Sequence, residues 1–299
     1  MPTLKHRSLL CRARPWAFVA SLVLLGQAAF GASTIDPLNK YAHGANVGWI
    51  DARADGTNGA VIGQAYCSGH LWSANVGWIG LGNGPTNGFH YSNASSNDWG
   101  VNHDGAGNLR GYAYGANIGW IAFETNGNPR LDLLTGALSG HAWGANVGWI
   151  SLSNAQAFVQ TDTLDPGPDS DGDGIPDPWE LDLAGNLTDY GPHPDDDDGD
   201  GVPDVEEYRA DTHPGQDASN LQVTEFAKSG TTGQVTWTVS PKRLYRLEHS
   251  PTATNGAPWV DSGLGVIPPG AGPTLTRAIT VPATTTRFFR AKAVVPLSP

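Results

Sequence analysis

Short stretches in which apolar and polar residues alternate dominate the last third of the chain. Val235, Trp237 and Val239 alternate with polar neighbours, and Tyr245 and Leu247 do the same. This period of two is typical of an antiparallel strand with one buried face. Five such segments are expected to form strands: 221–227, 234–239, 244–249, 275–281 and 288–294. Together they predict a small C-terminal β-sandwich over residues 219–299.

A six-residue phrase, Ala-Asn-(Val/Ile)-Gly-Trp-Ile, occurs four times before residue 160. Its tryptophans, Trp49, Trp78, Trp120 and Trp149, are 29, 42 and 29 residues apart, so the full repeat is a doubled unit of 71 residues. Repeats of this kind are copies of one supersecondary unit that bury a shared core. The spacing therefore predicts one repeat-built antiparallel β domain over residues 32–160, with two-fold internal pseudo-symmetry.

Each copy is expected to be a three-stranded meander. In the third copy the pattern predicts strands at 109–115 and 118–123, and in the fourth copy at 130–133, 137–144 and 147–152. The Ala-Asn pair before the last strand of each copy indicates a tight turn. Because asparagine readily adopts a left-handed backbone conformation, we expect it to do so in these turns.

The repeated aromatic residues admit two interpretations. Large apolar side chains at equivalent positions are expected to pack between copies and to be buried. Alternatively they form an exposed platform for sugars or another ligand, with these candidate residues: Trp72, Trp78, Tyr114, Trp143 and Trp149. Exposed, coplanar rings would favour the platform. His70 and His141 have no carboxylate or cysteine at metal-ligand spacing, so we expect them to lie on strand faces.

Acidic residues are concentrated in one segment of the chain. Residues 161–218 hold 19 Asp and Glu against a single Arg or Lys, Arg209, whereas the net charge of the whole chain is −12. Such a segment repels itself unless cations neutralise it. The same negative charge argues against nucleic acid as a partner.

Two loops within this segment have the spacing of a calcium-binding loop. The first has acids at positions 1, 3, 5, 9 and 12 and glycine at position 6, and the second repeats this spacing 27 residues later. Alternate acids point inward, glycine permits the bend, a backbone carbonyl fills position 7, and the last glutamate closes the site with two oxygens. The expected Ca²⁺ ligands are Asp169, Asp171, Asp173, Ile175, Asp177 and Glu180 in the first loop and Asp196, Asp198, Asp200, Val202, Asp204 and Glu207 in the second.

These loops resemble the calcium-binding repeats of thrombospondin type 3 and of related bacterial stalk modules. Pro176 and Pro203, and the lack of a long helix before each loop, set them apart from a paired EF-hand. The resemblance implies that calcium is structural and makes a compact spacer of residues 161–218. We expect a short helix after each loop, near residues 179–183 and 205–210. The alternative is a merely solvated acidic linker.

Other parts of the chain resemble modules of bacterial exported proteins. The phrase Gly-His-Ala-Trp-Gly-Ala-Asn-Val-Gly-Trp-Ile at residues 140–150 resembles a repeat found in many such proteins. Residues 219–299 resemble the fibronectin-type-III-like modules that follow calcium loops in them. These resemblances imply an exported protein with this architecture, and they imply no activity.

The N-terminus has the pattern of an export signal. Four basic residues precede an apolar run at 16–30, which predicts a signal peptide over residues 1–31 with cleavage near Gly31 and Ala32. A retained membrane anchor is the alternative, although the run is short for a span. We expect the mature chain to be secreted or held at the cell surface without a transmembrane span. Cleavage leaves Cys67 without an intrachain partner, so we expect it to be a small apolar core residue.

No catalytic motif is recognised in the sequence, and the paired acids that could serve a glycosidase are nearly all assigned to the calcium loops. The leading hypothesis is a secreted, calcium-stabilised, non-enzymatic surface, adhesion or structural protein that displays the repeat domain to a cell-surface glycan or protein. The second hypothesis is a carbohydrate-binding module that uses the repeated aromatic residues. An enzyme of unrecognised type, such as a hydrolase with a site at the rim of the repeat fold, is left open.

Overall fold

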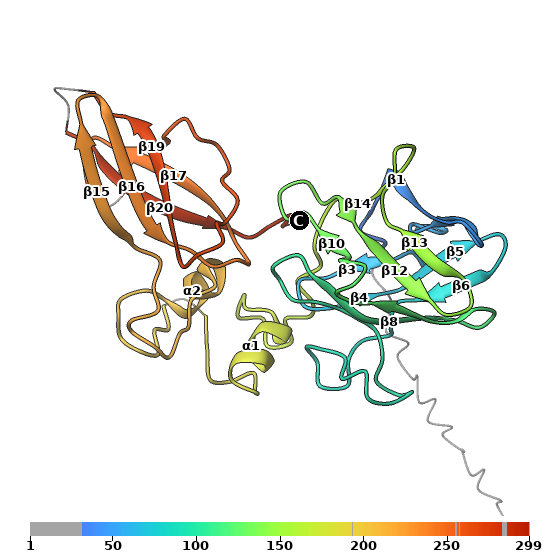
Figure 1. Cartoon of the computed structure of the whole chain (residues 1–299). Helices are drawn as coiled ribbons and strands as arrows, with labels where there is room; N and C mark the ends of the chain where they lie inside the picture. The colour runs from blue at the N-terminus through green and yellow to red at the C-terminus, as the bar shows by residue number, and fades with distance from the viewer. Residues whose placement is uncertain (1–31, 193, 255, 257, 283–285, 299) are drawn as a thin grey trace, which may run out of the picture.

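The computed structural model describes residues 32–192, 194–254, 256, 258–282 and 286–298. Two β-rich bodies are joined through a segment with two short helices, α1 (Asp177–Leu183) and α2 (Asp204–Ala210) (Figure 1). The chain is therefore all-β apart from these helices, which is the class that the sequence predicts. The predicted signal peptide lies outside the described residues. In the part of the chain that the structure describes, no helix is both long and apolar enough to cross a membrane.

The first body is a closed barrel of eight antiparallel strands built from four hairpins. Each hairpin contains one copy of the repeated phrase, and neighbouring hairpins pair edge to edge. The last strand pairs with the first, His43 opposite Ser151 and Gly44 opposite Ile150, which closes the ring. The barrel strands are β1 (Ile35–Gly44), β2 (Gly48–Asp51), β5 (His70–Ser73), β6 (Gly77–Gly80), β8 (Leu109–Gly115), β9 (Gly119–Phe123), β12 (His141–Gly144) and β13 (Gly148–Ser151).

Shorter strands extend the hairpins towards the predicted meanders. In the third copy β7 pairs with β8, so that copy has three consecutive strands, as expected. The first copy takes its extra strand from the far end of the domain, because β14 pairs with the start of β1, Ile35 opposite Thr161. The additional strands are β3 (Val61–Ile62), β4 (Cys67–Ser68), β7 (Val101–His103), β10 (Arg130–Leu131), β11 (Leu138–Ser139) and β14 (Val159–Thr161).

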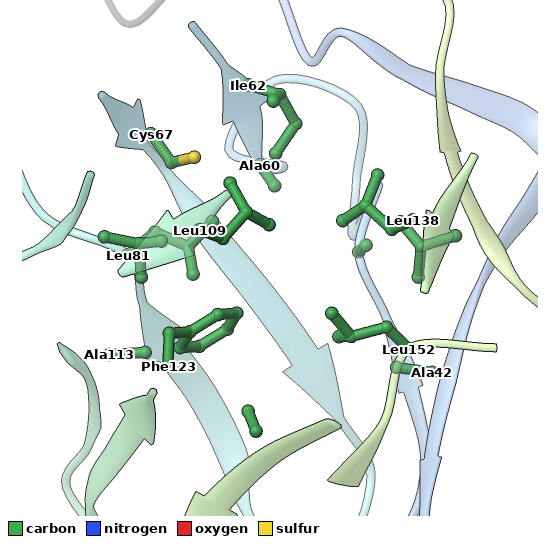
Figure 2. Close-up of a cluster of buried hydrophobic side chains, with 14 of the residues drawn as sticks. Ala42, Ala60, Ile62, Cys67, Leu81, Leu109, Ala113, Phe123, Leu138 and Leu152 are labelled. Atoms are coloured by element: carbon green, nitrogen blue, oxygen red, sulfur yellow. The ribbon is translucent and has the colours of Figure 1, made fainter. Parts of the chain in front are cut away.

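Aliphatic side chains fill the barrel (Figure 2). The isoleucine that follows each repeated tryptophan points inward, and these four residues, Ile50, Ile79, Ile121 and Ile150, are 0–4% exposed. An eight-stranded barrel has an interior just wide enough for side chains to fill it. Burying each isoleucine contributes on the order of 2–3 kcal/mol before the entropic cost of ordering it. Cys67 lies in the same core, and burial raises the pKa of its thiol to about 12, which agrees with its predicted role as an apolar core residue.

The left-handed residue of each hairpin turn is glycine, so the expectation that asparagine would take this conformation is wrong. Gly48, Gly77, Gly119 and Gly148 have φ values of +74° to +81°. In the first hairpin the Val47 amide donates to the Gly44 carbonyl, and the left-handed glycine then leads into the returning strand. A turn followed by a left-handed glycine suits the right-handed twist of a hairpin.

The asparagine side chains instead connect neighbouring hairpins. Each donates a 3.0 Å hydrogen bond from Nδ2 to a backbone carbonyl in the turn of the next hairpin. The four bonds run in one direction and form a closed ring at one end of the barrel: Asn46 to Val147, Asn146 to Ile118, Asn117 to Val76, and Asn75 to Val47. The repeated asparagine therefore explains how four separate hairpins assemble in one register.

The second body is a sandwich of two three-stranded antiparallel sheets. Trp237, Tyr245 and Leu247 form its centre and are fully buried. All five predicted strands are present, and one more, β18, was missed because it has only two residues. The sheets contain β15 (Val223–Ser229), β16 (Thr232–Thr238) and β19 (Thr274–Thr280), and β18 (Val260–Asp261), β17 (Leu244–Ser250) and β20 (Phe288–Val294).

Candidate functional site

The first acidic loop brings three of its predicted ligands together. Carboxylate oxygens of Asp169, Asp171 and Asp173 lie within 4.8 Å of one another. Asp169 accepts hydrogen bonds from the amides of Gly172 (2.8 Å) and Gly174 (3.1 Å), which curl the loop around it. Both glycines have positive φ, so the bend depends on them.

The second loop repeats this geometry. Oxygens of Asp196, Asp198 and Asp200 also lie within 4.8 Å of one another. Asp196 accepts from the amides of Gly199 (2.9 Å) and Gly201 (3.0 Å), which are the equivalents of the two glycines in the first loop. The two loops therefore fold in the same way at an interval of 27 residues.

A glutamate from the helix after each loop is buried beside these aspartates. Glu180 and Glu207 are both 0% exposed. Neither carboxylate oxygen of Glu180 has a hydrogen-bond partner among the described residues, and the same is true of Oε2 of Glu207. Burial, together with the charges of Asp173 and its neighbours, raises the pKa of Glu180 to about 7. Burial also raises the pKa of Glu207 to about 7, against the opposing hydrogen bond from Thr212.

These orphaned oxygens fit a bound cation. A buried carboxylate without a donor carries a penalty of roughly 1–3 kcal/mol or more. A cation at the position where the three aspartates converge supplies the missing partner of the glutamate. The donor set at each loop consists of oxygens alone, which matches a hard cation of the calcium or magnesium class and not zinc or copper.

Asp177 and Asp204 have a different role from the one that the spacing predicts. Both oxygens of Asp177 accept hydrogen bonds from Ser170, one from the amide (2.7 Å) and one from the hydroxyl (2.6 Å). Asp204 likewise accepts from the amides of Gly191 (3.0 Å) and Asp197 (3.1 Å). Their oxygens are occupied in holding the entrance of each loop, so they position the loop where the sequence predicted a ligand.

The position-7 residues are placed close to the loops, and the expected helices are present. Ile175 is fully buried and packs with Val205 in a small apolar cluster between the loops, and its amide donates to Asp173 (2.7 Å). The amide of Val202 donates to Asp200 in the same way (2.7 Å). Coordination by the carbonyls of Ile175 and Val202 stays a prediction. Helices α1 and α2 begin within the loops and confirm the helix that was expected after each one.

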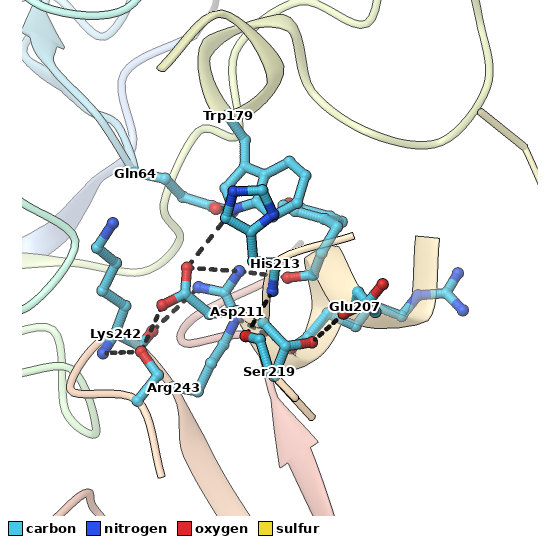
Figure 3. A network of polar contacts seen from close by, with 12 residues as sticks. Gln64, Trp179, Glu207, Asp211, His213, Ser219, Lys242 and Arg243 are labelled. Atoms are coloured by element: carbon cyan, nitrogen blue, oxygen red, sulfur yellow. Dashed lines mark hydrogen bonds and ion pairs between the residues drawn. The ribbon is translucent and has the colours of Figure 1, made fainter. Parts of the chain in front are cut away.

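The sequence gave no indication of a contact network that joins the second loop to both β bodies (Figure 3). Arg243, at the edge of the sandwich, donates to the carbonyls of Tyr208 (2.5 Å) and Arg209 (2.9 Å) at the end of α2. The hydroxyl of Tyr208 donates to Gln64 of the barrel (3.4 Å). Arg243 is 4% exposed, so its charge is committed to this junction. Its partners are 34 and 35 residues away along the chain, which is why no local pattern reveals them.

The repeated aromatic residues form a belt on the outside of the barrel. Their rings pair across each hairpin with centroids 4.8–4.9 Å apart. The tryptophans and tyrosine of the belt are 38–48% exposed. The interpretation that they are buried between copies is therefore wrong. We define the aromatic belt as His43 with Trp49, Trp72 with Trp78, Tyr114 with Trp120, and Trp143 with Trp149.

A second ring flanks each repeated tryptophan on its other side. Tyr41, His70, Tyr112 and His141 lie 5.9–6.2 Å from the tryptophan of their own hairpin, near to edge-on. Both histidines thus lie on strand faces, as expected. Cross-strand aromatic contacts stabilise a hairpin by about 0.5–1 kcal/mol each. The rings therefore support the hairpins from outside and still leave part of each indole accessible.

Comparison of the chain with models of protein families, with curated proteins and with solved structures found no match.

Proposed function

We propose that this protein is a secreted, calcium-stabilised adhesion protein without enzymatic activity, which displays the barrel to ligands at a cell surface. The observation that carries the proposal is the aromatic belt, whose rings stay accessible on a rigid, closed barrel. Large aromatic side chains on a rigid scaffold are the usual anchors of binding surfaces.

Calcium is the cation that suits the two acidic loops. Asp169, Asp171, Asp173 and Glu180 would hold one ion, and the equivalent residues of the second loop would hold another. The bound ion would neutralise carboxylates that otherwise repel one another. Exposed loops of this kind are expected to bind calcium with a Kd of roughly 10⁻⁴ to 10⁻³ M, which is suited to extracellular concentrations. The protein's own residues provide the loop geometry through the amide bonds to Asp169 and Asp196.

A second candidate function, carbohydrate binding, is favoured by the accessibility of one group of side chains. These are Trp72, Trp78, Tyr114, Trp143 and Trp149, and each is 38–48% exposed. Within each pair the ring planes are tilted by 57–61°, so the rings are exposed but not coplanar. That geometry suits a sugar stacked on one ring and edged by the next, more than a flat platform for a long glycan.

A glycan array probed with the mature chain, residues 32–299, in calcium and in chelator, tests both candidates. Binding to glycans that is lost in a Trp72→Ala, Trp78→Ala, Trp143→Ala and Trp149→Ala variant supports carbohydrate recognition. Adhesion to whole cells without any array signal supports adhesion to a protein ligand. Absence of both array binding and cell adhesion would contradict the proposed function.

A further inference from the structure

The four ring pairs of the aromatic belt are of two kinds that alternate around the barrel. The second and fourth hairpins carry the same three residues: His70, Trp72 and Trp78 in one, and His141, Trp143 and Trp149 in the other. Their geometry also agrees, because the tryptophan rings are 4.9 Å apart in both, tilted by 59° and 61°. We refer to these two groups as the His-Trp-Trp sites. The first and third hairpins replace one tryptophan by His43 or Tyr114.

The order of strands places the two His-Trp-Trp sites on opposite walls. Going round the closed barrel, the hairpin β5–β6 is separated from β12–β13 by β8–β9 on one side and by β1–β2 on the other. The side chains of both sites point away from the core. One compact ligand, or one flat surface, therefore cannot contact both sites at the same time.

The surroundings of the sites fit an uncharged sugar better than a protein partner. Between neighbouring hairpins, the positions that face outward hold Asp51, Gly80, Ala122 and Ser151, which divide the belt into four separate strips. A stable protein interface needs about 800 Å² of continuous surface on each partner, which such strips do not provide. A single pyranose matches their size, because its C–H face stacks on an indole while its hydroxyl groups reach polar side chains.

Polar side chains are available beside the rings for this purpose. The imidazoles of His70 and His141 lie 5.9 and 6.1 Å from Trp78 and Trp149. Asp51 lies directly opposite Trp72 in the strand register, and a 2.7 Å ion pair with Lys40 balances its charge. The sites are therefore close to neutral, as recognition of an uncharged ligand requires.

We infer that the barrel is a bivalent carbohydrate binder whose two His-Trp-Trp sites, on opposite walls, cross-link glycan chains or glycan-coated surfaces. This inference rests on the carbohydrate-binding function proposed above. Because the sites face apart, the second site adds bridging between surfaces and does not strengthen attachment to one surface.

Beads that carry hexasaccharides of glucose, mannose or N-acetylglucosamine test the inference with the mature chain in calcium. Binding capacity per bead and agglutination of beads are measured for the wild type, for each paired variant (Trp72→Ala with Trp78→Ala, and Trp143→Ala with Trp149→Ala) and for all four changes together. His43→Ala with Trp49→Ala is the matched control, because it removes a ring pair of the other kind. Threonine replacements at the same positions repeat the test with a residue that favours strands, and light scattering establishes that each variant is monomeric.

We expect the wild type to bind and to agglutinate one type of bead. Each paired variant should keep about half of the binding in solution and lose agglutination, as expected for two independent sites. The fourfold variant should not bind, and the control should behave as the wild type. Agglutination by a monomeric paired variant, loss of all binding when one pair is removed, or binding without agglutination by the wild type would overturn bivalence. A wild type that binds none of the beads would reject the carbohydrate function itself, and the bivalence that rests on it.

Discussion

At the scale of single residues, Glu180 and Glu207 carry most of the case for cation binding. Clusters of exposed aspartates are common on protein surfaces, but a glutamate with no solvent exposure and an oxygen without a partner is not. The 12-residue spacing identified both glutamates correctly. It did not identify the role of Asp177, because its hydrogen bonds with Ser170 depend on the curvature of the folded loop.

Glu207→Gln should weaken calcium binding at the second loop and leave the first loop unchanged. Loss of one charged ligand is expected to reduce the affinity by about tenfold or more, equivalent to ~1.4 kcal/mol. Glu206→Gln is the matched control, since Glu206 is exposed and its pair with Arg209 contributes less than about 0.5 kcal/mol. Calorimetric titration with calcium measures both variants. Equal affinities for the two variants would contradict the assignment of Glu207.

The pH dependence of the cation-free protein follows from the same two residues. Their pKa values are raised from 4.5 to about 7 in the folded state, so the folded block binds more protons than the unfolded block between these values. Stability in chelator should therefore be greatest below pH 4.5 and should fall as the pH rises through 7. With calcium bound the trend should reverse, because the ion requires ionised carboxylates.

Protease resistance of the acidic block at pH 5 and at pH 7.5, normalised to cleavage of an unstructured peptide, measures this pH effect. In chelator we expect more resistance at pH 5, and in excess calcium more at pH 7.5. The same order under both conditions would show that Glu180 and Glu207 do not govern the stability of the block.

At the scale of elements, the hairpin was predictable but its orientation was not. The phrase Gly-Trp-Ile places two apolar residues side by side, and these necessarily point to opposite faces of a strand. Pattern alone does not decide which one faces inward. In the structure the isoleucine fills the narrow interior and the tryptophan lies outside. Closure of the barrel could not be read from local pattern either, because it depends on the pairing of β13 with β1 across the whole domain.

Adjacent substitutions in β6 test this orientation. Ile79→Ala removes a fully buried side chain and should lower the free energy of unfolding by about 2–5 kcal/mol. Trp78→Ala removes the larger side chain, but the tryptophan is 43% exposed and makes only cross-strand ring contacts, so the loss should be about 1 kcal/mol. Urea unfolding of the two variants compares them directly. A larger loss for Trp78→Ala would contradict an outward-facing belt.

At the scale of the whole molecule, the acidic block is a joint between the two β bodies. Arg243 of the sandwich holds the end of α2, and Tyr208 of the same helix contacts Gln64 of the barrel. The C-terminal segment returns to the barrel as well, where the carbonyl of Leu297 accepts from the amide of Leu164 (2.9 Å). The helix that supplies Glu207 is therefore fixed by contacts from outside its own loop.

Arg243→Ala should weaken calcium binding at the second loop more than at the first. The change leaves the last carbonyls of α2 without their donor, at a cost of about 1–3 kcal/mol, and frees the helix that carries Glu207. Arg246→Ala is the control, because this neighbouring arginine is 43% exposed and makes only a 3.8 Å pair with Asp261. Calorimetry gives the two affinities. An equal loss at both loops would point to general destabilisation of the protein.

The dependence of the acidic block on calcium is tested most directly by limited proteolysis of the mature chain. With calcium present, we expect residues 165–217 to resist cleavage. Chelator should open this segment while the barrel and the sandwich stay intact, because the carboxylates of each loop then face one another without a counter-charge. Asp173→Ala with Asp200→Ala should reproduce the effect of chelator, and excess calcium should reverse that effect only in the wild type. Equal protection with and without calcium would contradict the account and would reduce the block to a plain acidic linker.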